Sequence, residues 1–167
     1  WNAKQMKEQE VFSRYDSILQ NNLKNYGILN YMSSHDDGQP FDKNREMPFK
    51  TATMLLLTPG TSQVYYGDET SRKLTVEGAT GDANLRSLMN WKDLKTDSLT
   101  QKIHKHWQKL GQFRANHPAV GAGKHTLIEH TNGLVFSRIY NSDKVVIGIN
   151  ISASKRNINV SSIFKEG

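Results

Sequence analysis

Residues 27–38 read Gly-Ile-Leu-Asn-Tyr-Met-Ser-Ser-His-Asp-Asp-Gly, a short apolar run that ends in a polar loop. The pattern returns at residues 63–69, where Gln-Val-Tyr-Tyr is followed by Gly-Asp-Glu. Short apolar runs bounded by turn residues predict buried strands, here over 27–32 and 63–66. Between them the sequence predicts a helix near residues 46–57. A strand, a helix and a second strand in that order favour two parallel strands joined by a crossover.

Further helices are predicted on both sides of this unit. Residues 2–22 place apolar side chains at a helical period, and residues 98–117 do so again along one face. Ser98 and Gln101 predict a capping box at the start of the second of these helices. The stretch 70–97 has no clear period and is predicted to be a long loop.

The pattern of the sequence changes after Pro118. Residues 125–130, 133–140, 143–151 and 156–161 predict about four antiparallel strands joined by turns. Two parallel strands make a poor independent sheet because their edges stay open. We therefore expect the chain to be a piece of a larger α/β barrel or doubly wound sheet, in which chemistry takes place at the carboxyl ends of the strands.

Composition narrows the class of protein. The 167 residues include 22 basic and 16 acidic ones, for a net charge of +6, and 36% are hydrophobic, which is enough for a folded core. The lack of cysteine excludes disulfides, thiolate zinc sites and a cysteine nucleophile. The basic residues are spread along the chain, which argues against a nucleic-acid partner, and no apolar run is long enough to span a membrane.

His35 and Asp36 directly follow the first predicted strand. From the residues alone they could bind a metal, act as a base with its orienting acid, clamp a polyhydroxylated substrate or form a structural pair. Asp36 and Asp37 do not predict the two carboxylates of a glycosidase, because adjacent residues at a strand end point to opposite faces. If one of the two reaches a substrate, we expect the other to turn away and cap a turn with Gly38.

Other polar and ring side chains leave their roles open. Asp68 and Glu69 follow the second predicted strand and could cap backbone amides, pair with an arginine or bind a ligand. Of the ring side chains, we expect two tryptophans in the core and two histidines on the surface of a β hairpin. These are Trp91 and Trp107, and His125 and His130.

Three motifs taken together resemble the α-amylase family of glycoside hydrolases. Residues 30–36, Asn-Tyr-Met-Ser-Ser-His-Asp, resemble the family's seventh-strand motif of an aromatic residue, two variable positions, Asn, His and Asp. Residues 58–69 resemble the eighth-strand motif P-G-x-P-x-I-Y-Y-G-D-E, and residues 81–91 resemble an Arg-x-Pro-Met-x-Trp stretch of related enzymes. The chain departs from these patterns at Ser34, Ser62 and Leu88.

The resemblance covers the whole chain and implies an α/β fold. Residues 1–117 would be the C-terminal portion of a catalytic (β/α)8 TIM barrel, and residues 118–167 a small C-terminal antiparallel β domain, short for this family. The exposed edges of an incomplete barrel predict that the isolated chain self-associates.

The resemblance also implies a parent protein that is a retaining glycoside hydrolase acting on α-glucans such as starch and maltooligosaccharides. Asp36 would stabilise the transition state and His35 would hydrogen-bond the sugar, with Tyr31 and Arg86 as further substrate-binding residues. In the family the nucleophilic Asp and the acid/base Glu lie on earlier barrel strands. They would therefore precede this chain, and the chain alone is expected to be inactive.

Two alternatives stay open. One is a non-catalytic amylase-like scaffold kept for binding or interaction. The other is a metal-dependent phosphohydrolase using His35 and Asp36, which needs the pair on a helix near another histidine. We expect no metal site or cofactor in this chain, although the family allows calcium in the parent. The sequence does not fix the compartment: export suits a polysaccharide-degrading parent, and a cytoplasmic location stays open.

Overall fold

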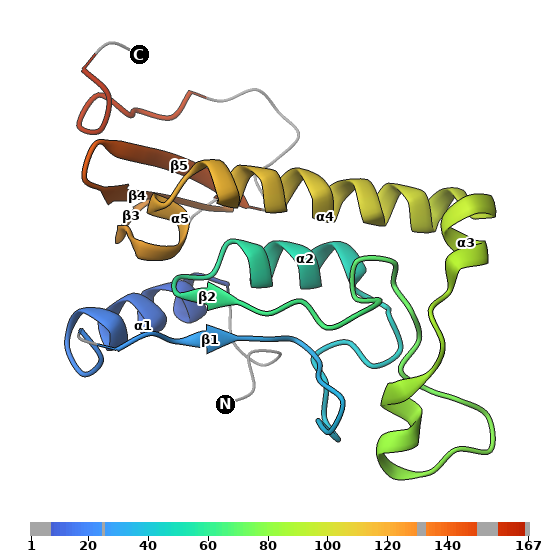
Figure 1. Cartoon of the computed structure of the whole chain (residues 1–167). Helices are drawn as coiled ribbons and strands as arrows, with labels where there is room; N and C mark the ends of the chain where they lie inside the picture. The colour runs from blue at the N-terminus through green and yellow to red at the C-terminus, as the bar shows by residue number, and fades with distance from the viewer. Residues whose placement is uncertain (1–7, 25, 130–132, 150–156, 166–167) are drawn as a thin grey trace.

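A computed structural model describes residues 8–24, 26–129, 133–149 and 157–165 (Figure 1). The helices of the described chain are α1 (Glu8–Gln20), α2 (Pro48–Leu56), the 3-10 helix η2 (Gly81–Arg86), α3 (Trp91–Thr96), α4 (Ser98–Asn116) and α5 (Ala119–Ala122). Its strands are β1 (Leu29–Asn30), β2 (Thr61–Ser62), β3 (Lys124–Glu129), β4 (Leu134–Tyr140) and β5 (Asp143–Ile149).

β1 and β2 form the predicted parallel pair and run side by side in Figure 1, with Leu29 opposite Thr61. The Asn30 side-chain amide donates to the carbonyl oxygens of Pro59 and Thr61 at 2.9 and 3.2 Å, which fixes the register from the side chain as well. α2 connects the two strands, as expected for a crossover.

The second strand lies at β2 and not at the predicted residues 63–66. Residues 63–66 do not pair as a strand. Their aromatic side chains contact residues 85–87 instead. The Tyr65 hydroxyl donates to the carbonyl of Leu85 at 3.0 Å, and the Tyr66 hydroxyl donates to that of Ser87 at 2.8 Å. A strand-like run of apolar residues thus anchors η2 and the turn that follows it.

α2 begins at Pro48, where the missing N–H costs no helical hydrogen bond. The loop before it is held by buried Asp42, whose two carboxylate oxygens accept the backbone N–H groups of Glu46 and Met47 at 2.8 and 2.9 Å. The helix packs against α4 through a cluster of buried apolar side chains. These are Ala52, Leu55, Leu56, Ile103 and Trp107.

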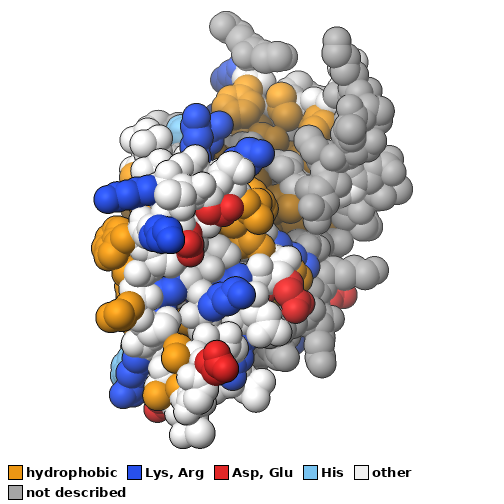
Figure 2. Space-filling model, turned by 90° about the vertical axis from the view of Figure 1, so that its right-hand side faces the viewer, with side chains coloured by type: hydrophobic (Ala, Val, Ile, Leu, Met, Phe, Trp, Pro, Cys, Tyr) orange, Lys and Arg blue, Asp and Glu red, His pale blue; other side chains and the backbone are white. Residues whose placement is uncertain are grey.

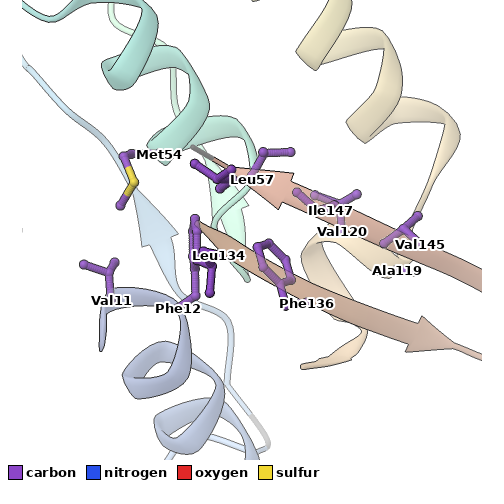
Figure 3. Close-up of a cluster of buried hydrophobic side chains, with 11 residues drawn as sticks. Val11, Phe12, Met54, Leu57, Ala119, Val120, Leu134, Phe136, Val145 and Ile147 are labelled. Carbon is purple, nitrogen blue, oxygen red and sulfur yellow. The ribbon is translucent and has the colours of Figure 1, made fainter. Parts of the chain in front are cut away.

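A second cluster joins the helices to the antiparallel sheet (Figure 3). Side chains from α1 and α2 meet side chains from α5, β4 and β5 there, so one core is shared by residues on both sides of position 117. The members are Val11, Phe12, Met54, Leu57, Ala119, Val120, Leu134, Phe136, Val145, Ile147 and Ile149. The division into two domains at that position stays a prediction.

The antiparallel sheet has the order β3-β4-β5 within the described residues. The fourth strand predicted at 156–161 is wrong for its described part, because residues 157–160 have no strand structure. The segment uses its hydrogen bonds locally instead: the backbone N–H and the hydroxyl of Ser161 both donate to the Asn159 side chain, at 3.0 and 2.7 Å.

The stretch 70–97 is not a plain loop, since it contains η2 and α3. The cap of α4 is Asp97 and not the predicted Ser98: the Asp97 carboxylate accepts the Thr100 backbone N–H at 2.7 Å. That hydrogen bond also lowers the pKa of Asp97. A carboxylate at the N-terminus of a helix is favourable because it faces the positive end of the helix dipole.

Two of the four ring side chains differ from expectation. Trp107 is buried as predicted, but Trp91 stands 62% exposed at the first residue of the short helix α3. His125 is buried and not on the surface, with its ring 4.7 Å from that of Phe136. The alternation of β3 turns this side chain toward α1 and the core. The prediction for His130 lies outside the described residues.

Candidate functional site

The two polar loops predicted to carry chemistry follow β1 and β2 and meet at the same end of the parallel pair. The Ser33 hydroxyl, after β1, donates to the carboxylate of Asp68, after β2, at 2.5 Å. Figure 2 looks onto the end of the molecule toward which both strands run. Acidic and basic side chains are interspersed there with hydrophobic ones.

Asp36 and His35 lie in the loop after β1 and are both open to solvent. The exposed fractions of their side chains are 63% and 64%, and His35 Nε2 lies 3.8 Å from Asp36 Oδ2. The Ser34 hydroxyl donates to Asp36 Oδ1 at 2.7 Å. This hydrogen bond lowers the pKa of Asp36, and the neighbouring charges of His35 and then Arg86 lower it further. Asp36 therefore presents an ionised, partly oriented carboxylate.

Arg86 reaches this loop from the end of η2, 51 residues further along the chain. Its Nε donates to the carbonyl oxygen of His35 at 3.1 Å, while Nη2 lies 3.6 Å from the carboxylate of Asp82. The structure thus brings three of the sequence-predicted site residues together: His35, Asp36 and Arg86. The Tyr65 and Tyr66 hydroxyl groups position the backbone around Arg86 through their hydrogen bonds on either side of it.

Tyr31 is half exposed and lines a cavity of about 570 Å³ bounded by α1, β1 and α2. Asp37 and Gln39 line the same cavity from the loop after β1. The carboxylate of Asp37 accepts the backbone N–H of Gln39 at 2.9 Å, so Asp37 is the one of the two aspartates that caps the turn around Gly38. The two adjacent aspartates therefore have separate roles.

Sequence reasoning did not identify Arg45 and Ser33 as parts of this site. Arg45 Nη2 lies 2.6 Å from the carboxylate of Asp68, which resolves the open role of Asp68 in favour of pairing with an arginine. No motif contains Arg45, and its partner lies 23 residues away. The polar composition of the loop before α2 was the one sequence feature that could have drawn attention to Arg45.

The metal-dependent alternative does not fit the geometry, because His35 lies in a loop and not on a helix. In the segments that the structure describes, no three His, Asp or Glu side chains are grouped to hold a metal ion. None of the described helices combines the length and the apolar character needed to cross a bilayer.

In sequence, the chain is similar to a curated alpha-amylase. The chain is 43% identical over 125 residues to the periplasmic alpha-amylase of Escherichia coli strain K12, a match that covers 75% of this chain and 18% of that protein. The chain therefore spans less than a fifth of the length of this curated relative. No protein-family model matches the chain.

Several solved structures share the fold over most of the chain, and two serve as examples. The debranching enzyme from Nostoc punctiforme superposes with a TM-score of 0.56 at 23% identity, over 91% of this chain and 32% of that one. The structure of AmyP in complex with maltose gives a TM-score of 0.57 at 16% identity, over 76% of this chain and 32% of that one. At these identities the likeness concerns the fold.

Proposed function

Because the chain belongs to the α-amylase family of glycoside hydrolases, we propose that it supplies one catalytic carboxylate, Asp36, to a retaining hydrolase of α-glucans. His35 binds the sugar beside it. The observation that carries the proposal is the exposed His35–Asp36 pair at the carboxyl end of β1, the position where barrel enzymes hold their catalytic groups.

The chemistry assigned to Asp36 follows from its surroundings. Cleavage of a glycosidic bond passes through an oxocarbenium-like transition state, so a fixed negative charge near the ring stabilises that state more than the ground state. Ser34 and Arg86 lower the pKa of Asp36 and so keep it ionised.

The other predicted site residues are proposed to bind the substrate around Asp36. His35 offers a ring nitrogen to the sugar hydroxyls, and Arg86 both orients the His35 backbone and adds positive charge at the rim. Tyr31 offers an exposed ring face on which a sugar of the chain can rest. Maltose, which is bound in the AmyP structure, represents the proposed substrate class, and maltooligosaccharides and starch are its longer members.

The nucleophile and the acid/base are proposed to lie on earlier barrel strands of the longer protein. In this proposal residues 1–117 belong to the barrel and residues 118–167 to a C-terminal β domain. Because the curated relative is a periplasmic protein, we propose that the longer protein is exported from the cytoplasm.

The test is an anomeric assay on the full-length protein. Incubated with maltooligosaccharides and followed by proton NMR, it should release the α-anomer first, because two successive displacements restore the configuration. The isolated 167-residue chain should release no sugar under the same conditions. Release of the β-anomer first, or no release by the full-length protein, would contradict the proposal, and the latter would favour a non-catalytic scaffold.

A further inference from the structure

A buried ion pair lies beneath the exposed His35–Asp36 loop. Arg45 Nη2 is 2.6 Å from Asp68 Oδ1, and the side chains of these residues are 5% and 0% exposed. Removing two charges from water costs several kcal/mol per ion unless their geometry is good and further hydrogen bonds are made. A buried pair therefore needs further hydrogen bonds, and the groups that supply them show which parts of the chain the pair connects.

The pair makes two additional hydrogen bonds. The Ser33 hydroxyl donates to Asp68 Oδ1, the same oxygen that faces Arg45, at 2.5 Å. Arg45 Nε donates to the carbonyl oxygen of Arg72 at 2.7 Å. The Arg45 backbone has φ of 61°, a left-handed conformation that costs a non-glycine residue energy and persists only where the surroundings hold it. Asp68, which follows β2, thus contacts the segment between β1 and α2 at two places, Ser33 near its start and Arg45 near its end.

The loop that carries Asp68 is itself closely packed. Gly67 has φ of 86°, and a Cβ atom there would lie 2.4 Å from Nε of Arg72. The Glu69 carboxylate accepts the Gly67 backbone N–H at 3.0 Å, which closes the turn. Asp68 is therefore presented from a fixed backbone, as a support for a precise site requires.

We propose that Asp68 is a positioning residue for Asp36 and acts through Ser33. Ser33 is 0% exposed and is followed directly by Ser34, the hydroxyl donor to Asp36. Anchoring Ser33 to Asp68 fixes the backbone from which Ser34 reaches the carboxylate. The catalytic meaning of this inference rests on the proposed function, whereas the geometric link does not.

The sharpest variant is Ser33→Ala, because it removes the link without changing any charge and leaves the Arg45–Asp68 pair in place. The matched control is Ser62→Ala, which removes a part-buried serine hydroxyl whose hydrogen bond, 2.9 Å to the carbonyl of Leu55, supports α2 instead. Each variant deletes one serine hydroxyl, so a difference between their Asp36 titrations reports on the place of the hydroxyl that was removed.

Two readouts separate positioning from a purely structural role. In the 167-residue chain, NMR titration of the Asp36 carboxyl should show its pKa raised by Ser33→Ala toward the ordinary aspartate value, because the Ser34 donor is less well aligned. His35 and Arg86 are the charged neighbours of Asp36, and both are unchanged in this variant. In the full-length protein, kcat for maltooligosaccharides should fall about 10-fold, with KM within about twofold.

The outcomes distinguish this inference from the proposed function. If Ser33→Ala and Ser62→Ala give the same Asp36 titration as the parent chain, the positioning role of Asp68 is overturned, whatever the enzyme does. If the full-length protein hydrolyses no glucan, the proposed function fails while the titration still tests the link. As a second variant, Asp68→Ala removes the acceptor of the Ser33 hydroxyl together with the charge facing Arg45. It should also lower kcat, and an unchanged kcat would contradict the role.

Discussion

The ionisation of Asp36 is controlled by its immediate neighbours and not by burial. Its carboxylate is open to water, so the Ser34 hydroxyl is the largest influence on its pKa and the charge of His35 the next. Water screens charges at such a site strongly, whereas a direct hydrogen bond keeps its effect. The neighbouring serine thus does more than the arginine to keep Asp36 charged.

This leads to a prediction for Ser34→Ala. Loss of the hydroxyl should raise the pKa of Asp36, because the ionised form loses its hydrogen-bond donor. An NMR titration of the carboxyl carbon measures the midpoint directly. Thr100→Ala is a suitable control, since the hydroxyl that it removes influences the pKa of Asp97 and is not among the influences on Asp36. An Asp36 midpoint unchanged in Ser34→Ala would refute the assignment of Ser34.

Gly60, directly before β2, is a position where the backbone conformation and close packing require glycine. It has φ of 90°, and a Cβ atom would lie 2.7 Å from the carbonyl oxygen of Ile28. Gly60→Ala should therefore lower the free energy of unfolding by about 2–4 kcal/mol, through backbone strain and a clash with rigid backbone. Gly27→Ala, which meets nothing within 4 Å, should cost little. Urea denaturation of both variants makes the comparison, and equal stability would contradict the argument.

The site residues differ in how far sequence could reveal them. His35 and Asp36 follow a strand within one local pattern, so the pattern placed them. Arg86 was also predicted as a site residue, because it lies in the separate motif at residues 81–91. Arg45 could not be predicted, because its importance depends on a partner across the fold and on a left-handed backbone that no local signal encodes.

At the scale of elements, a buried cation joins α2, α5 and the sheet. Arg138 on β4 is fully buried, and its Nη1 donates to the carbonyl oxygens of Leu57 and Val120 at 2.6 and 2.5 Å. His125 on β3 lies against it, with Nδ1 3.4 Å from Arg138 Nε. Burial, together with the charge of Arg138, lowers the pKa of His125 to about 4.

The buried His125 predicts a pH dependence of stability. The folded state binds a proton on His125 only near pH 4, whereas the unfolded chain binds one near pH 6.5, so the unfolded state gains protons as the pH falls through this window. Stability should therefore fall by about 3 kcal/mol between pH 7 and pH 4 from this group alone. Asp16 and Arg138 are the charged groups facing it.

Urea denaturation of the chain at several pH values tests this expectation. In His125→Phe, which suits the neighbouring rings of Phe12 and Phe136, the loss of stability between pH 7 and pH 4 should be smaller by that amount. A variant that loses as much stability as the parent chain over this range would show that His125 does not bind the proton.

Elements with long, regular patterns were predictable, and short ones were not. α4 and the strands β3, β4 and β5 are long enough for side-chain period to dominate, and their positions are confirmed to within about two residues. β2 is only two residues long, because pairing with β1 ends where β1 turns away, so its position depends on the partner strand. The apolar residues beyond it serve η2 instead.

The isolated chain as a whole is expected to self-associate. The parallel pair has two strands in the described structure, and the proposed barrel would require neighbours on both of its edges. Sedimentation velocity of the 167-residue chain should therefore show dimers or larger species at micromolar concentration. The full-length protein, in which the proposed barrel closes, should lose this behaviour. A chain that stays monomeric at those concentrations would contradict the expectation.

In the proposed function, Asp36 acts on the transition state of glycosidic bond cleavage. The most direct test is kcat of the full-length protein carrying Asp36→Asn, compared with Asp37→Asn, which changes an adjacent carboxylate that caps a turn. The account predicts that kcat of Asp36→Asn on maltooligosaccharides falls at least about 100-fold while that of Asp37→Asn falls far less. Near-normal turnover by Asp36→Asn would contradict it.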